Sequence, residues 1–370
     1  MTVKLHTALL VLTIGCTAAA QAQTSGAERP GAVEKIKVHG ASLEGNLEGD
    51  PAERDVFVYL PPSYASQPNR RYPVLYFIHG YGATAEAYWK LMVVPEAADK
   101  VMGAGTVHEM IVVLPDAHTI YDGSMYSNSP TTGDWEAYIT HDLVAYIDSH
   151  YRTIADRDSR GLAGHSMGGY GTLRLAMKYP GIFSSIYAMS SCCLMNNPGA
   201  GRGGRGPAPP AQGANGAPPA PPAPPAPPAG ENGRGAGRAG RGGRGGGFAN
   251  ILSAEAAAWS PNPANPPKFF DLPNQDGTLH PEIAAKWIAN SPLAFVEEYV
   301  PELKTYRAIA MDVGDMDNLM ATNKEMDESL TRLGVKHTFE IYEGTHGNRV
   351  KERFETKLLP FFSANLKSQR

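Results

Sequence analysis

The chain has 370 residues, 42% of them hydrophobic, and a formal net charge of −4. The tract 198–247 contributes six arginines and one glutamate to that charge, so the rest of the chain has a net charge of −9. An acidic balance of this kind argues against a nucleic-acid partner for the folded part. About 300 residues outside this tract and the N-terminal leader suit one domain with a large core.

The N-terminus has the pattern of a secretory signal peptide, residues 1–22. Lys4 precedes the apolar run 8–14, and Ala20-Gln21-Ala22 has the small-x-small pattern of a cleavage site. We therefore expect cleavage after position 22 and a periplasmic or secreted mature protein. The apolar run is too short to span a bilayer, and we expect no transmembrane segment elsewhere. Cys16 is a poor match to a lipoprotein site because Thr13 precedes it by three positions, which disfavours a lipid anchor.

Strand-like and helical runs alternate along residues 23–370, which predicts a single α/β domain with a mostly parallel sheet covered by helices on both faces. The apolar positions of 137–150 follow helical spacing, and 170–179 and 281–288 are also helix-like. We expect the first two strands to pair as an antiparallel hairpin. The predicted strands are 35–38, 55–60, 74–78, 110–114, 160–163, 186–189, 308–311 and 338–342.

The tract 198–247 interrupts this pattern. It consists almost only of Gly, Pro, Ala and Arg, so it cannot bury enough apolar surface to offset the entropy cost of ordering, and we expect it to be disordered. The aromatic- and proline-containing segment 248–301 follows, at the place where a cap over the active site would be inserted. Trp259 in this segment, together with Trp135, Glu136 and His165, is a candidate for substrate contact, although core packing is an equally good interpretation of the aromatic residues.

Residues Gly164-His165-Ser166-Met167-Gly168 form a Gly-x-Ser-x-Gly sequence between a strand-like run and a helix-like run. This is the context of a nucleophile elbow, in which a sharp strand-to-helix turn presents a serine to an imidazole and to backbone donors. Glycines at both ends allow the turn to close. We therefore predict that Ser166 is the nucleophile.

The base and the acid are expected in loops after later strands. His346 lies in the glycine-flanked loop after the strand 338–342 and is the predicted base, whereas His280 and His337 are better explained as surface or capping residues. For the acid, Asp317 lies furthest into the loop after the strand 308–311. Asp315 remains an alternative that could instead bind the local backbone, and Asp312 would still be at the end of the strand.

The oxyanion hole requires two backbone N–H donors. One is the residue after the nucleophile, Met167. The other lies in the loop after the buried strand 74–78, which continues as His79-Gly80-Tyr81-Gly82, and we assign it to Tyr81. His79 precedes the serine and is expected to brace this loop by hydrogen bonding.

These residues resemble the esterase family of α/β-hydrolases that includes S-formylglutathione hydrolase, feruloyl esterases, enterochelin esterases and mycolyltransferase antigens. The sequence segments that resemble the family are Val58-Tyr59-Leu60-Pro61-Pro62, Gly133-Asp134-Trp135-Glu136 and the elbow. The resemblance runs from about 33 to 362. It implies the α/β-hydrolase fold, with nucleophile, acid and base at Ser166, Asp317 and His346 and oxyanion donors at Tyr81 and Met167.

The predicted function is hydrolysis of a carboxylic ester through an acyl-enzyme, with no metal or organic cofactor required. The substrate would be a small-molecule, carbohydrate or lipid ester, and the sequence does not indicate an oligomeric state. An acyltransferase, which passes the acyl group to a sugar or lipid hydroxyl, is the alternative; a binding module without chemistry and a peptidase are weaker ones. Cys192 and Cys193 are expected to be two free buried thiols, and a vicinal disulfide between them is the alternative.

Overall fold

The computed structural model describes residues 30–196 and 247–369. The predicted signal peptide 1–22 and nearly all of the predicted disordered tract 198–247 lie outside the described residues. Only Gly247, at the end of that tract, is described, and it begins helix α6 (Gly247–Trp259).

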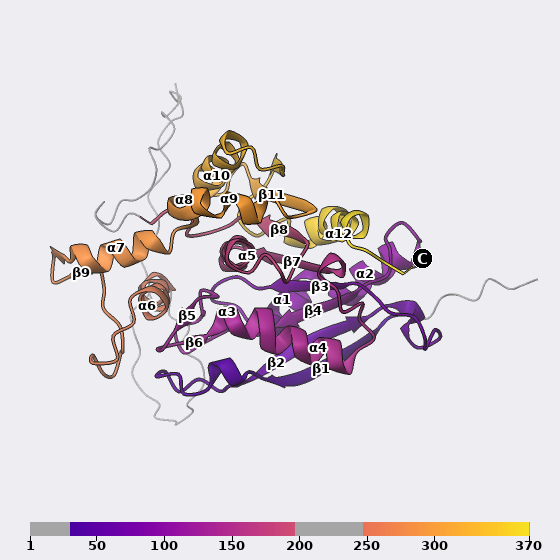
Figure 1. Ribbon diagram of the computed structural model, residues 1–370, viewed down its shortest axis with the longest axis horizontal. Helices are drawn as coiled ribbons and strands as arrows, with labels where there is room; N and C mark the ends of the chain where they lie inside the picture. Colours follow the sequence, from indigo (N-terminus) through magenta and orange to yellow (C-terminus); the bar gives the residue numbers. More distant parts are fainter. Residues whose placement is uncertain (1–29, 197–246, 370) are drawn as a thin grey trace, which may run out of the picture.

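Within the described residues an eight-stranded sheet has the order β1-β2-β4-β3-β7-β8-β11-β12. β1 pairs antiparallel with β2, as predicted, and β2 pairs antiparallel with β4, whereas the pairs from β4 to β12 are parallel. The sequence therefore predicted the mostly parallel sheet correctly (Figure 1). The strands are β1 (Ala32–His39), β2 (Glu53–Leu60), β3 (Val74–Ile78), β4 (Ile111–Pro115), β7 (Arg160–His165), β8 (Ser185–Met189), β11 (Ala308–Gly314) and β12 (Thr338–Tyr342).

Helices cover both faces of this sheet, because each central strand is apolar on both sides. In β3, Val74, Tyr76 and Ile78 join one buried cluster, and Leu75 and Phe77 join the other. This alternation is the expected result of the two-residue side-chain period of a strand buried on both faces. The first cluster includes side chains of α4 (Leu143–His150), α5 (Met167–Lys178), α7 (Pro281–Ala289) and α10 (Met320–Arg332). The second includes side chains of α1 (Ala85–Met92), α2 (Val94–Gly103), α11 (Val350–Arg353) and α12 (Leu359–Asn365).

The predicted helix 137–150 has a different form from a single regular helix. It begins earlier, as α3 (Trp135–Ala137), passes through a π-helical turn (Tyr138–Asp142) and continues as α4. In the wide turn the Thr140 hydroxyl donates to the Glu136 carbonyl at 2.6 Å. A threonine side chain that bonds the preceding turn competes with regular backbone hydrogen bonding, which accounts for the irregularity.

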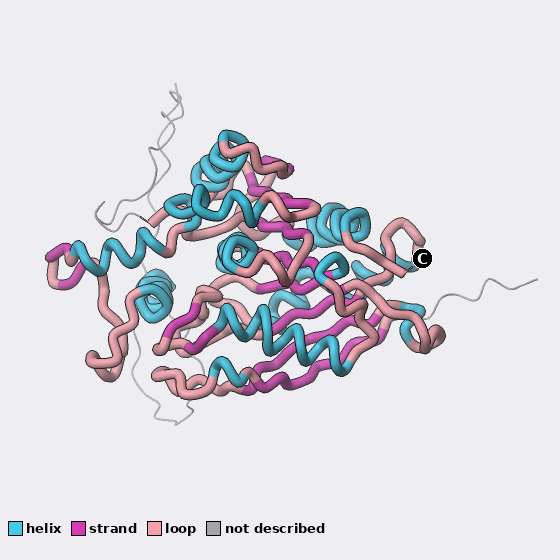
Figure 2. The backbone as a smooth tube through the Cα atoms, viewed as in Figure 1, coloured by secondary structure: helices cyan, strands magenta, loops and turns pink. Residues whose placement is uncertain are grey.

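The segment 248–301 lies at one end of the sheet, where Figures 1 and 2 show α6 beside β5 (Asn128–Ser129) and β6 (Gly133–Asp134), with α7 next to α6. It also contains the short hairpin β9 (Asn274–Gln275) and β10 (Thr278–Leu279), α8 (Pro292–Phe295) and the start of α9 (Val300–Leu303). Its aromatic side chains Trp259, Phe270 and Trp287 are buried in the core. The predicted helix 281–288 is confirmed as α7.

Candidate active site

The Gly-x-Ser-x-Gly sequence forms a tight turn between β7 and α5. Ser166 has φ = 60° and ψ = −113°, a conformation that non-glycine residues rarely adopt, and Met167 begins the helix. The glycines are required by close packing: a Cβ at Gly164 would lie 2.3 Å from the Gly168 carbonyl oxygen, and one at Gly168 would lie 1.9 Å from a backbone oxygen at the end of β3. The strained turn therefore holds the serine hydroxyl out from the carboxyl edge of the sheet.

Ser166, His346 and Asp317 come together at this edge from three loops. His346 Nε2 lies 2.9 Å from Ser166 Oγ, and His346 Nδ1 lies 2.8 Å from Asp317 Oδ2. The second carboxylate oxygen of Asp317 accepts from the Leu319 backbone N–H at 2.9 Å. The Asp317 side chain is fully buried, whereas the His346 side chain is 40% exposed. This chain of contacts has the geometry of a nucleophile, a base and an orienting acid.

The hydrogen bonds of Asp317 also set its charge. Burial opposes ionisation of the carboxyl, but the hydrogen bonds from the His346 ring and the Leu319 N–H outweigh it, so the pKa of Asp317 lies below its ordinary value. Asp317 is therefore a carboxylate at neutral pH, which can accept a hydrogen bond from the Nδ1–H of His346.

The two other aspartates of this loop have different partners. Asp315 Oδ1 accepts from the Gly344 backbone N–H at 2.9 Å and so ties the acid loop to the loop that carries His346. Asp312 lies in β11, as expected, and is fully buried against Arg353. The geometry thus separates the candidates: of the three, it is Asp317 that contacts the imidazole.

Tyr81 and Met167, the two predicted oxyanion donors, both lie close to Ser166. Tyr81 follows β3, and an added Cβ on the preceding residue, Gly80, would lie 3.3 Å from Ser166 Cβ. Met167 is the first residue of α5, so its N–H has no partner within the helix. In the ranges that the structure covers, neither of these two backbone N–H groups donates to a backbone carbonyl outside the regular elements.

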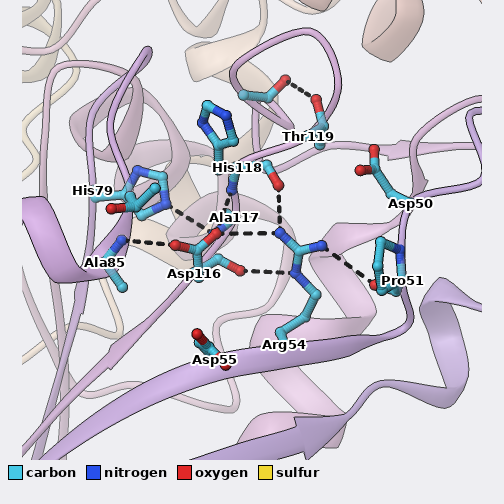
Figure 3. Close-up of polar contacts among 12 residues, drawn as sticks. Asp50, Pro51, Arg54, Asp55, His79, Ala85, Asp116, Ala117, His118 and Thr119 are labelled. Atoms are coloured by element: carbon cyan, nitrogen blue, oxygen red, sulfur yellow. Dashed lines mark hydrogen bonds and ion pairs between the residues drawn. The ribbon is translucent and has the colours of Figure 1, made fainter. Parts of the chain in front are cut away.

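His79 braces the loop that carries Tyr81, as the sequence predicted (Figure 3). Its Nε2 lies 2.8 Å from the Ala117 backbone N–H, and its Nδ1 lies 2.9 Å from the Gly80 carbonyl oxygen. Because an amide N–H only donates and a carbonyl only accepts, the ring must be neutral with its proton on Nδ1. Burial lowers the pKa of His79, which stabilises this neutral form.

Arg54 and Asp116 form further hydrogen bonds behind His79, which the sequence did not predict (Figure 3). Arg54 Nε donates to the Asp116 carbonyl at 3.2 Å, and the Asp116 carboxylate accepts from the Ala85 and His118 backbone N–H groups at 2.9 and 3.0 Å. The contacts connect β2, α1 and the loop after β4. The sequence signal that could have indicated these contacts is the position of Asp116, an aspartate directly after the buried strand β4.

The structure does not place the four candidate substrate-contact residues at an open surface. Trp135, Glu136, His165 and Trp259 expose 1, 0, 3 and 3% of their surfaces. Because they are buried, these four side chains do not form an exposed substrate-contact surface, which corrects the expectation from the sequence. The sequence pattern did not distinguish an aromatic or polar residue near the site from one packed behind it, because that depends on neighbours distant in the chain.

Each of the four has another role in the structure. Trp135 Nε1 donates to the Thr132 carbonyl at 2.8 Å. The Glu136 carboxylate forms ion pairs with Arg174 at 2.7 Å and with Lys178. The Trp259 ring packs against the rings of Tyr170 and Trp287, with centroids 5.6 and 5.4 Å away. His165 hydrogen-bonds the loop that carries His346 and is treated below.

Cys192 and Cys193 are both free thiols, and they contact each other behind the elbow. The Cys192 N–H donates to the Ser166 carbonyl at 3.1 Å. Cys193 Sγ donates to Glu255 Oε1 at 3.4 Å. Burial raises the pKa of Glu255 to about 7, so this carboxyl is largely protonated in mildly acidic solution.

Within residues 30–196 and 247–369, no three or more His, Cys, Asp or Glu side chains are grouped so as to hold a metal ion. In the same residues we find no helix with the length and apolar character required to cross a bilayer.

Comparisons with known proteins agree with this architecture. A family model described as "Putative esterase" matches residues 51–361. "Esterase Rv1288" of Mycobacterium tuberculosis is 34% identical over 131 residues, which are 35% of this chain and 27% of that protein. An S-formylglutathione hydrolase of Paracoccus denitrificans is 26% identical over 147 residues, 36% of this chain and 50% of that protein. The chain thus spans at most about half the length of these curated relatives.

Solved structures resemble the whole described fold. A ferulic acid esterase has a TM-score of 0.61 and 21% identity, with 91% of this chain and 99% of that chain covered. A fluorophosphonate-binding serine hydrolase of Staphylococcus aureus, FphF, has a TM-score of 0.58 and 17% identity, with 90 and 99% covered. At these identities the likeness establishes the fold.

Proposed function

Because the chain belongs to the esterase family whose model it matches over residues 51–361, we propose that it is a serine hydrolase that cleaves a carboxylic ester through an acyl-enzyme. The observation that carries the proposal is the continuous contact from Ser166 Oγ through the His346 ring to the Asp317 carboxylate, at 2.9 and 2.8 Å. A serine hydroxyl is a weak nucleophile until an adjacent base accepts its proton.

In the proposed mechanism, Ser166 Oγ attacks the ester carbonyl while His346 Nε2 takes the hydroxyl proton. The charge that develops on the carbonyl oxygen is stabilised by the N–H groups of Tyr81 and Met167, each of which would contribute about 2.7 to 4 kcal/mol to lowering the barrier. His346 then donates the proton to the leaving alcohol. Water, activated by the same imidazole, hydrolyses the acyl-enzyme. The buried Asp317 carboxylate keeps the Nδ1 proton in place throughout.

We also propose that the protein acts outside the cytoplasm after cleavage behind Ala22. The support is the charged start, short apolar run and small-x-small pattern of residues 1–22. Mass spectrometry of the N-terminus of the exported protein tests this: a first residue of Gln23 is expected, and an intact leader on the active protein would contradict it.

The acyltransferase alternative is not favoured, because the relatives and structural neighbours named above are described as esterases or hydrolases. Their names suggest esters of phenolic acids, and thioesters, as the first substrates to test.

The decisive experiment compares Ser166→Ala with Ser149→Ala, an exposed serine that bonds its own helix. With short p-nitrophenyl esters, Ser166→Ala should lower kcat by at least about 10⁴-fold, whereas Ser149→Ala should be unchanged. A fluorophosphonate probe should label the unmodified protein at Ser166, as located by peptide mapping. Retained turnover in a folded Ser166→Ala variant would show that another residue is the nucleophile.

A further inference from the structure

His165 is a residue of the elbow, and its ring lies against His346, the base; it is 3% exposed. It is the last residue of β7 and directly precedes Ser166. Its Nε2 lies 2.7 Å from the backbone carbonyl oxygen of His346, which is 181 positions later in the sequence. The two imidazole rings have centroids 4.7 Å apart.

The partners of His165 define its protonation. The His346 carbonyl can only accept, so Nε2 of His165 must carry a proton and donate it. On the other side of the ring, Nδ1 lies 2.6 Å from the hydroxyl of Tyr88, in α1. Burial raises the pKa of Tyr88, which therefore stays protonated and donates to Nδ1. The ring is thus a neutral link that accepts from α1 and donates to the backbone of the base.

We propose that His165 is a positioning residue for the reaction: its Nε2–H holds the His346 main chain so that the imidazole of His346 stays within reach of Ser166. The proposal rests on the proposed function of Ser166 and His346. It concerns the base loop because Gly347 and Asn348, which follow His346, are exposed and give that loop little packing of its own.

The charges around His165 are consistent with this role. Burial, together with the nearby His346 ring, lowers the pKa of His165 to about 4, although the hydrogen bond to the His346 carbonyl and the Asp317 carboxylate act in the opposite direction. Because His165 is neutral at the pH of an esterase assay, it does not repel the imidazolium that forms on His346 during the reaction. A cation at this position would disfavour that intermediate.

Two substitutions separate the hydrogen bond from the packing of the ring. His165→Phe keeps a planar ring and removes the donor, whereas His165→Gln keeps an amide N–H that can reach the His346 carbonyl. His337→Phe is the matched control. Like His165, His337 bonds a backbone carbonyl, that of Val335; its other ring nitrogen bonds the Asp327 carboxylate, and it belongs to no part of the site.

The measurements are the labelling rate of Ser166 by a fluorophosphonate and the kcat and KM for a p-nitrophenyl ester. We expect His165→Phe to lower kcat and the labelling rate by about ten- to a hundredfold with KM within about twofold, because a displaced base affects the reaction more than binding. His165→Gln should recover activity to within about fivefold of the unmodified protein, and His337→Phe should keep the full rate.

A folded His165→Phe variant labelled at the unmodified rate would overturn the proposal, as would equal losses in the Phe and Gln variants. Should His165→Phe not fold, Tyr88→Phe decides the matter: loss of the donor to Nδ1 should slow labelling by about threefold or more, and an unchanged rate would overturn the proposal. If the unmodified protein is not labelled at Ser166 at all, it is the proposed function that fails.

Discussion

Replacing Asp317 with asparagine tests the geometry of the site most sharply, because the structure determines which way the new amide must face. Oδ1 of Asp317 accepts from the Leu319 backbone N–H, and Oδ2 accepts from His346 Nδ1. In Asp317→Asn the amide oxygen must stay on the Leu319 side, since an NH₂ group there would oppose an N–H. The NH₂ group therefore faces His346.

That orientation places His346 in the wrong tautomer. Nδ1 must then accept a hydrogen bond, so the ring proton moves to Nε2 and the ring can no longer accept the Ser166 proton. For a triad aspartate this exchange lowers kcat by about 10⁴-fold, which corresponds to about 5.4 kcal/mol in the activation free energy. KM should change little, because substrate does not contact a buried carboxylate.

The control is Asp315→Asn. Its side chain oxygen accepts from the Gly344 N–H, and an asparagine oxygen can do the same, so kcat should stay within about threefold. Both variants are assayed for p-nitrophenyl ester hydrolysis after circular dichroism has shown that they are folded. The reasoning is refuted if Asp317→Asn keeps more than about a tenth of kcat, or if Asp315→Asn loses as much as Asp317→Asn.

Three further predictions concern stability, measured by urea unfolding. The pKa of Glu255 is raised from its ordinary value of 4.5 to about 7, so between these pH values only the unfolded state releases the Glu255 proton, and the unmodified protein loses stability. Glu255→Gln has no such proton, so its free energy of unfolding should rise relative to that of the unmodified protein by about 3 kcal/mol as the pH rises from 4.5 through about 7. Gly168→Ala should fail to fold or lose more than about 4 kcal/mol, since the new Cβ would lie 1.9 Å from a backbone oxygen. Arg353→Met should cost about 3 to 5 kcal/mol, because it leaves the fully buried Asp312 carboxylate without its cation.

Each of these predictions has an internal control. A pH-independent difference between Glu255→Gln and the unmodified protein would show that this carboxyl does not titrate with a raised pKa. Gly181→Ala should change stability by no more than about 0.5 kcal/mol, since nothing lies within 4 Å of its Cβ. Adding Asp312→Asn to Arg353→Met should recover part of the lost stability, and no recovery would mean that the unpaired charge is not the cause.

The sequence alone determined the features that depend on neighbouring residues. The strands of the main sheet were predicted close to their observed places, and the inner strands β3, β4 and β8 were the clearest, because a strand buried on both faces appears as a short continuous apolar run. The elbow was equally visible, since the strained Ser166 and its flanking glycines are all within five positions. Chain order then indicated His346 as the base, in a loop after the last strand.

Features that depend on contacts between residues distant in the chain could be seen in the folded structure but not in the sequence. Asp315 and Asp317 are two positions apart and chemically identical, and they are distinguished by the direction in which a folded loop points them. The four residues that the sequence named as candidates for substrate contact are buried. The sequence pattern could not show this, because the burial of a side chain depends on neighbours that are distant in the chain. The partner of His165 lies 181 positions away, and its role became apparent when the elbow and the base loop were seen side by side.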